Sequence, residues 1–317
     1  MTEGLSASSG RPILVTGSIR SGTTWVGRMI AESPSVGYIH EPFNPWDSDK
    51  KLGICSPRVP YWFFYVTEEN AETRQEAISR ALQFDYNLIG GLKGIRSWHD
   101  VKRVKREYSE FRANRCRGAR PLIKDPFALF SAEWFAKTFD MDVVVLIRHP
   151  AAVVSSLKRL KWGLPFCHLL EQPALIQDHL HPFKERLREF RDGQRDIIDQ
   201  GILLWNTLYH VVNQYRKGHR EWIFLRHEDI SRNPLQRFQA LFAGLGLDFS
   251  ATVRSVVQRH SAACNRSEVP MEWAHSLKRD SRSLIWTWKE RLTGSEVERV
   301  REGTWKVAKE FYSDEDW

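Results

Sequence analysis

Cysteines and long apolar runs are scarce in this sequence, and each scarcity excludes a class of protein. The four cysteines lie far apart, and no two have the short spacing of metal ligands; they are Cys55, Cys116, Cys167 and Cys264. A disulfide framework is therefore not expected at this length. No run approaches the roughly 20 apolar residues of a membrane-spanning helix. Residues 1–11 lack the profile of a signal peptide, so we expect a disordered N-terminus and a cytoplasmic protein.

Two common nucleotide-binding motifs are missing as well. A Walker A loop has Lys directly after its second Gly, but Thr23 follows Gly22 here. The Gly-x-Gly-x-x-Gly fingerprint of dinucleotide-binding proteins is also absent. The formal net charge is +8, yet no recognised nucleic-acid-binding motif accompanies it. We therefore expect the positive charge to serve an anionic nucleotide or an acidic acceptor, with no nucleic-acid partner.

The apolar pattern that is present predicts one α/β domain over residues 12–317. Residues 141–147 form a nearly continuous apolar run, which is typical of a central parallel strand buried on both faces. A first strand and helix are expected over 12–33, a short strand over 121–126 and a buried strand over 222–226. Helices are expected directly after Pro150 and over 68–83, 129–138, 234–245 and 295–312, and two helices broken near Gly193 over 182–217. Strands that alternate with helices indicate a central parallel sheet with helices on both faces.

Residues 12–25, with the sequence PILVTGSIRSGTTW, contain the strongest functional motif. An apolar run ends in a tight loop, and Thr23 opens a segment with apolar residues at helical spacing. Unpaired backbone N–H groups and the positive end of a helix dipole meet in such a turn and bind anions. Arg20 adds a positive charge, and hydroxyl groups come from Ser21, Thr23 and Thr24. We interpret the loop as a phosphate or sulfate site; an ordinary strand-to-helix turn is the alternative.

A second anion-binding motif is Arg148-His149-Pro150, with Ser156 eight residues after the arginine. Arg148 follows the predicted strand at 141–147, and open α/β sheets bind ligands at the carboxyl ends of their strands. An Arg at that point can form paired bonds to a phosphate, and a Ser about two turns into the next helix can face the same anion.

Both motifs resemble those of the sulfotransferases. The segment RSGTTW at 20–25 is similar to the loop that grips the 5′ end of the sulfuryl donor, 3′-phosphoadenosine 5′-phosphosulfate, and Arg148 with Ser156 is similar to the 3′-phosphate motif. The resemblance implies a P-loop-like nucleotide-binding architecture and in-line transfer, without a metal, to a hydroxyl or, as second choice, an amine. It assigns donor binding to Arg20, Ser21, Gly22, Thr23, Thr24, Trp25, Arg148 and Ser156.

Two later stretches resemble nucleotide-binding parts of the same family. His227 stands where the family often has a Tyr near the adenine. Glu228 and Asp229 beside it could act as an acid/base pair, but a cap on the following helix and bonds to local backbone are the preferred interpretation. The resemblance also suggests three further donor ligands, for which solvated surface is the alternative: Arg266, Ser267 and Lys289.

The resemblance further implies a stabilising cation and a general base. Lys124, together with Arg20, is placed to stabilise the transferred group. Cytosolic sulfotransferases use a His two residues after the matching Lys as base, but Pro126 takes its place here. In tyrosylprotein and several bacterial and carbohydrate sulfotransferases a Glu near the position of Glu41 is the base, which makes Glu41 the preferred candidate. The alternatives are a purely structural turn residue at that position and two other candidate bases, His40 and Asp125.

The sequence leaves the identity of the acceptor and the oligomeric state open. Residues 93–120 are strongly basic. Three interpretations are open for this segment: a solvated helix and loop, an inserted flap near the acceptor cleft, and a surface for an acidic acceptor. The aromatic run at 61–65 lines an acceptor pocket or belongs to the core. We expect a carbohydrate, lipid or natural-product acceptor, with a homodimer as one option. The alternative functions are a P-loop-type nucleotide kinase and a non-catalytic protein that binds nucleotides or polyanions.

Overall fold

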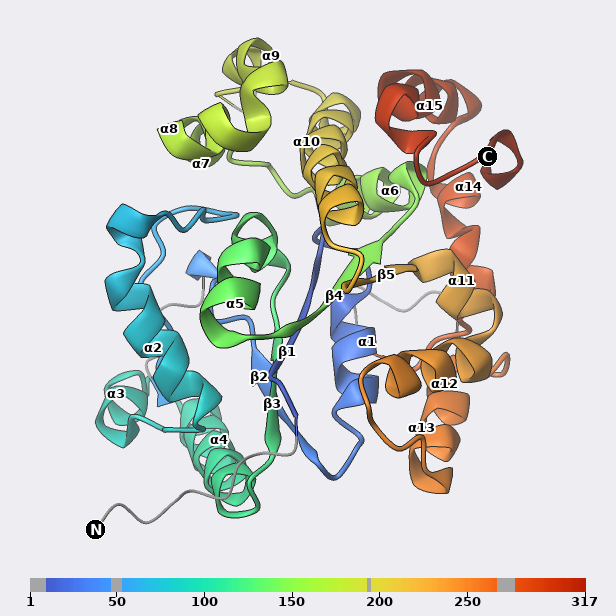
Figure 1. Ribbon diagram of the computed structural model, residues 1–317. Coiled ribbons are helices and arrows are strands. Elements are labelled where there is room, and N and C mark those ends of the chain that lie inside the picture. The colour runs from blue at the N-terminus through green and yellow to red at the C-terminus, as the bar shows by residue number, and fades with distance from the viewer. Residues whose placement is uncertain (1–9, 47–52, 193–194, 267–276) are drawn as a thin grey trace. The chain divides into compact units, whose positions relative to one another are not determined.

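The structure is a computed structural model that describes residues 10–46, 53–192, 195–266 and 277–317 (Figure 1). Its residues group into two compact units, each of which combines distant parts of the chain. Unit 1 contains Met1–Thr16 and Val26–Val143, and unit 2 contains Gly17–Trp25 and Val144–Trp317. The single domain predicted over 12–317 stays a prediction.

Unit 1 holds three neighbouring parallel strands and several helices. Its strands are β1 (Ile13–Gly17), β2 (Val36–His40) and β3 (Arg120–Lys124), and β3 pairs with both of the others. Its helices are α2 (Glu72–Leu82), α3 (Leu88–Lys93), α4 (Trp98–Cys116) and α5 (Ala132–Phe139), with 3-10 turns η2 (Glu68–Asn70) and η3 (Pro126–Ser131). Every residue of β1 and β3 is buried, as expected for strands covered on both faces.

Unit 2 packs helices around two parallel strands, β4 (Asp142–Ile147) and β5 (Ile223–Arg226). Its longer helices are α6 (Pro150–Leu160), α10 (Ile197–Gly218), α12 (Pro234–Gly244), α13 (Ala251–Ser261) and α15 (Gly294–Ala308). Its shorter ones are α7 (Cys167–Leu170), α8 (Pro173–Leu175), η4 (Ile176–Leu180), η5 (His181–Phe183), α9 (Lys184–Glu189), α11 (His227–Arg232), η7 (Ser283–Ile285), α14 (Thr287–Arg291) and η8 (Asp314–Asp316). α10 packs against α6 and α15, and their apolar side chains share one core cluster.

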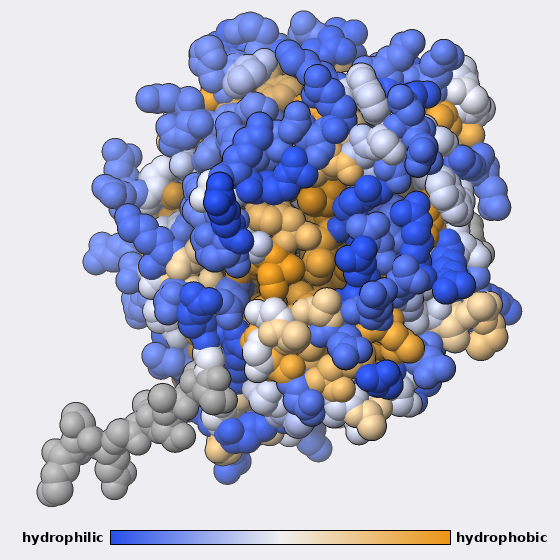
Figure 2. Space-filling view, turned by 45° about the vertical axis from the view of Figure 1, so that its right-hand side comes forward, coloured by the Kyte–Doolittle hydropathy of each residue, from blue (hydrophilic) through white to orange (hydrophobic). Residues whose placement is uncertain are grey.

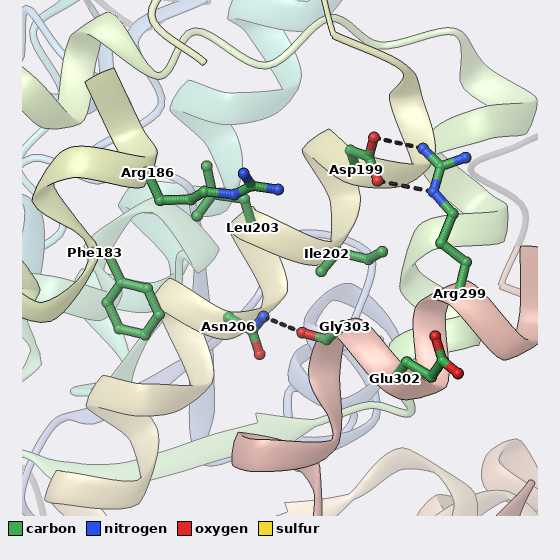
Figure 3. A pocket seen from close by; sticks show the side chains of 9 residues that line it. All are labelled: Phe183, Arg186, Asp199, Ile202, Leu203, Asn206, Arg299, Glu302 and Gly303. Atoms are coloured by element: carbon green, nitrogen blue, oxygen red, sulfur yellow. Dashed lines mark hydrogen bonds and ion pairs between the residues drawn. The ribbon is translucent and has the colours of Figure 1, made fainter. Parts of the chain in front are cut away.

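The strand order β2-β3-β1-β4-β5 confirms the predicted α/β class, a parallel sheet with helices around it. The loop after β1 leads directly into α1 (Thr23–Ile30), so the predicted strand, loop and helix are all present. Hydrophilic residues cover much of the face drawn in Figure 2, in keeping with the formal net charge of +8. No helix among the described residues is long and apolar enough to cross a membrane.

Two predicted elements differ in detail. β5 is half-buried along its length rather than buried, because it is the last strand in the sheet order. The helix expected from residue 129 begins as an α-helix only at Ala132, because the preceding segment forms the 3-10 turn η3, whose start is capped by the side chain of Asp125. The break predicted near Gly193 separates α9 from α10, but Gly193 itself lies outside the described residues.

Three segments that sequence alone left open are now defined. The basic stretch contains α4, which packs Val104 and Phe111 inward, so it is a helix of unit 1 with an exposed basic face. In the aromatic run, Trp62, Phe63 and Phe64 are buried, which supports a core role. At the N-terminus, residues 1–9 lie outside the described residues, and Arg11 forms an ion pair with Asp142.

Candidate functional site

The loop after β1 closes tightly on itself. Ser21 donates two hydrogen bonds to the carbonyl oxygen of Ser18, at 3.2 Å from its backbone N and 2.7 Å from its Oγ. Gly17 has φ +147°, and a Cβ there would lie 2.5 Å from the carbonyl oxygen of Leu146. Gly22 has φ +96°, and a Cβ there would meet a ring carbon of His227 at 2.6 Å. Only glycine fits this backbone and this space, so both glycines are needed for the loop's shape.

Arg20 joins the loop to the second motif. Its Nε donates a hydrogen bond to Ser156 Oγ at 2.9 Å, and its carbonyl oxygen accepts one from Arg148 Nη1 at 2.6 Å. Its φ of +66° is uncommon for a residue with a side chain. The structure therefore brings together Arg20, Arg148 and Ser156, which come from two separate sequence motifs.

Positive charge is concentrated around Arg20. Burial, and after it the charges of four other arginines, together lower the pKa of Arg20 to about 10; those arginines are Arg148, Arg279, Arg291 and Arg159. Burial also lowers the pKa of Arg148, although the carboxylate of Glu228 opposes this. Arg148 Nε is buried without a hydrogen-bond partner in the part of the chain that the structure describes. A bound anion would relieve both the repulsion and the missing hydrogen bond.

Tyr209 on α10 supports this arginine cluster and was missed by sequence analysis. Its hydroxyl accepts a hydrogen bond from Arg148 N at 2.8 Å and lies 2.9 Å from Ser18 Oγ. Helical spacing marks Tyr209 only as a core position, and nothing in the sequence indicates that its hydroxyl reaches residues 61 and 191 positions away. One buried phenol thus ties the first loop to the second motif.

An aromatic slot lies beside the loop. The ring of Trp25 meets that of His227 edge-on, with centroids 6.0 Å apart. Both line a cavity of about 70 Å³ together with His260, Leu277, Arg279, Ser281 and Leu284. Burial and the charge of Arg148 hold the pKa of His227 well below its usual range, so its imidazole is neutral. This small, mostly apolar slot next to arginines suits a flat aromatic ring attached to an anion.

Glu228 bonds to backbone, as preferred from sequence, and its contacts also reach distant parts of the chain. Its carboxylate accepts hydrogen bonds from His149 N and from the Tyr312 hydroxyl, both at 3.0 Å. Glu228 thereby links α11 to the start of α6 and to the C-terminal segment. These contacts make it a buried structural acceptor rather than half of an acid/base pair.

Among the described residues, no contact connects the three further donor ligands suggested from sequence to the arginines around Arg20. Lys289 is exposed, and its Nζ lies 4.6 Å and 5.1 Å from the ring centroids of Trp286 and Trp288. Arg266 is also exposed. Ser267 lies outside the described residues. The arginines that do act on Arg20, including Arg279 and Arg291, carry no motif by which sequence could have identified them.

In unit 1, Glu41 and Lys124 form a buried ion pair. Lys124 is fully buried and Glu41 is 15% exposed at its side chain. Glu41 has φ +44°; its backbone N donates to the Lys124 carbonyl oxygen at 2.8 Å, and its Oε2 accepts from Asn44 Nδ2 at 2.7 Å. Burial raises the pKa of Glu41, but Lys124, His40 and the hydrogen bonds from Lys124 and Asn44 outweigh it, so the pKa is lowered. The structure therefore joins the two residues that sequence had proposed separately as base and cation.

The two alternative bases are placed differently. Asp125 is fully buried, and its carboxylate accepts hydrogen bonds from the backbone N of Phe43 at 2.5 Å and of Phe127 at 2.9 Å. Those bonds give Asp125 a structural role in the turn after β3. His40 is exposed, its Nδ1 lies 3.1 Å from the Tyr38 hydroxyl, and its Nε2 lies 3.9 Å from Glu41 Oε2. His40 is therefore a neighbour of Glu41 with access to solvent.

Within unit 1, Lys124 lies beside the strand and the helix between which the loop occurs in the sequence. It pairs with Val15 in the sheet register, two residues before Gly17. A Cβ on Gly27 of α1 would lie 3.0 Å from Lys124 Cγ. The end of β3 and the segments that flank the loop are therefore neighbours. No group of three or more His, Cys, Asp or Glu side chains able to hold a metal occurs in the described ranges.

Comparisons with known proteins identify the family of this chain. A sulfotransferase family model matches residues 12–251. The chain is 24% identical to carbohydrate sulfotransferase 4 of Mus musculus, covering 85% of this chain and 77% of that protein. It is 22% identical to carbohydrate sulfotransferase 5 of Homo sapiens, covering 92% and 74%. A solved sulfotransferase domain of the Synechococcus PCC 7002 olefin synthase aligns over 99% of both chains, with 16% identity and a TM-score of 0.47. The chain therefore belongs to the sulfotransferase family and is a sulfotransferase.

Proposed function

We propose that this enzyme transfers the sulfuryl group of 3′-phosphoadenosine 5′-phosphosulfate to a hydroxyl of a carbohydrate acceptor. The observation that carries the donor assignment is the buried cluster of Arg20, Arg148 and Ser156, whose Arg20 is surrounded by the charges of other arginines. Such a site requires an anionic ligand to be electrostatically satisfied. The names of the curated relatives support a carbohydrate acceptor.

The residues present fit the two ends of this donor. Arg148, with its unpartnered Nε, and Ser156 would bind the 3′-phosphate, and the cavity that Trp25 and His227 help to line would take the adenine. Arg20 and the N–H groups that open α1 would bind the 5′ end. The donor supplies an activated sulfuryl group, so the chain needs only to position both partners and to stabilise charge on the transferred oxygens.

Glu41 is the proposed general base, and Lys124 the proposed stabilising cation. Because its pKa is lowered, Glu41 stays a carboxylate at neutral pH and can accept the proton of the acceptor hydroxyl. The ion pair with Lys124 lowers the pKa of Glu41 and so makes Glu41 a weaker base. If Lys124 interacted with the transferred oxygens instead, the basicity of Glu41 would increase. His40 lies beside Glu41 with access to solvent and would pass the proton on.

A thermal-shift experiment with adenosine 3′,5′-bisphosphate tests the donor assignment. We expect this product nucleotide to raise the melting temperature of the wild-type chain, because a ligand at 100 times its Kd adds roughly 2.7 kcal/mol. ATP with magnesium should have little effect. Arg148→Ala should lose most of the shift, with Arg254→Ala, an exposed arginine on α13, as control. A shift with ATP and magnesium alone would favour the kinase alternative.

A further inference from the structure

An exposed apolar patch covers α3 and the start of α4. The exposed fractions of Leu88, Ile89 and Leu92 on α3 are 43%, 70% and 53%, and that of Trp98 on α4 is 80%. Of the seven large apolar side chains exposed in the described part of the chain, five lie within residues 88–108. A single exposed leucine is ordinary in a folded protein, but several large apolar side chains exposed on two successive helices indicate an interaction surface.

The patch is fixed by the way α3 packs. Gly90 and Gly91 are its buried residues, and a Cβ on Gly91 would come within 2.8 Å of the Tyr86 hydroxyl oxygen. Asn87 caps the helix by accepting a hydrogen bond from Gly90 N at 3.0 Å. Because the glycine face is held inward, the larger apolar side chains of α3 must face outward. Their exposure is therefore a property of the packed element.

Basic side chains predominate in the segment that carries this patch. Residues 88–117 contain nine Lys and Arg against three Asp and Glu. All three acidic groups are in ion pairs with arginines of α4: Asp100 and Glu107 with Arg103, and Glu110 with Arg106. On α4, Lys102 and Lys105 follow Trp98 at spacings of four and seven, so they share its helix face. We call Leu88, Ile89, Leu92, Trp98, Lys93, Lys102 and Lys105 the α3–α4 surface.

We propose that the α3–α4 surface docks onto an anionic lipid bilayer. Aliphatic side chains and a tryptophan enter the interfacial region, and lysines around them attract acidic headgroups. A second copy of the chain fits poorly, because a two-fold contact would bring two basic surfaces together. A soluble polyanion would satisfy the lysines but leave Ile89 and Trp98 in water. Only a partner that is both apolar and acidic matches every part of the surface.

Vesicle sedimentation with the full chain tests this proposal. We expect binding to phosphatidylcholine vesicles that contain phosphatidylserine, and at least tenfold weaker binding to vesicles of phosphatidylcholine alone. The double variant Ile89→Ser, Leu92→Ser should lose at least tenfold in affinity for the acidic vesicles. The double variant Lys102→Glu, Lys105→Glu should lose a similar amount. Lys137→Glu, an exposed lysine on α5, makes the same kind of charge change elsewhere and should bind like wild type.

Adenosine 3′,5′-bisphosphate binding provides the folding control, since none of these substitutions touches the proposed donor site. Equal binding of wild type and the Ile89→Ser, Leu92→Ser variant would overturn the proposal, because charge alone would then explain the attraction. No binding to acidic vesicles at low salt would also overturn it. So would a wild-type dimer, seen by light scattering, that this variant converts to a monomer, since a second copy would then be the occupant.

Discussion

One ion pair, between Glu41 and Lys124, determines what the proposed base can do. Removing Lys124 would leave burial as the main influence on Glu41, and burial raises the pKa of a carboxyl group. The lysine therefore keeps Glu41 ionised while lowering its strength as a base. Both effects can be tested by substitution.

Glu41→Gln should reduce kcat by about a hundredfold or more, because a general base contributes about 10²–10⁴ in rate. Donor affinity should hold, since none of the proposed donor contacts involves Glu41. Steady-state kinetics and calorimetry with adenosine 3′,5′-bisphosphate measure the two quantities. Asp125→Asn provides the comparison for a buried structural carboxylate. Near-full activity in Glu41→Gln would rule out its assignment as the base.

Lys124→Met should move the acidic limb of the kcat/KM profile to higher pH. In the wild type the lowered pKa keeps Glu41 ionised as pH falls through the ordinary range of glutamate, so activity is lost only in stronger acid. Without Lys124 the pKa rises, and Glu41 becomes protonated at a higher pH. Profiles of kcat/KM against pH for the two proteins check this. An unchanged limb would show that another group controls it.

The loop and the helix after it illustrate how local backbone shapes a site. Gly22→Ala should destabilise the protein by about 1–3 kcal/mol, because its φ of +96° is costly for alanine and the added Cβ would meet His227. Urea unfolding measures this loss, and donor affinity should fall with it. Gly218→Ala at the end of α10, where nothing lies within 4 Å of the added Cβ, is the control. Equal stability of both variants would contradict a strained loop.

Elements with strong local patterns could be predicted from sequence, whereas contacts between distant elements could not. The apolar run of β4 and the glycine-bounded loop each depend on neighbouring residues, so their positions were predictable. Tyr209, Arg279 and Glu228 act through contacts with residues far away in the chain. Their roles come from packing, which no spacing in the sequence encodes. The half-buried state of β5 likewise follows from its place at the end of the sheet order.

At the scale of the whole molecule, two groups of positive charge differ in their exposure: Arg20 and Arg148 are largely buried, and most basic side chains of α4 are exposed. At 0.1 M salt, interactions between exposed charges are largely screened beyond about 10 Å, whereas buried charges are screened much less. Raising the salt from about 50 to about 500 mM should therefore weaken vesicle binding far more than nucleotide binding. Vesicle sedimentation and calorimetry in matched buffers compare the two. A parallel decline would show that the arginine cluster is as open to solvent as α4.

The backbone of Arg20 has a consequence for how this enzyme would respond to selection. At φ +66° glycine would be the less strained residue, but only a cation supplies the charge and the bond to Ser156. Stability and function therefore favour different residues at the same position. A library selected for heat resistance alone should accumulate Gly at position 20, whereas one selected for sulfuryl transfer should retain Arg.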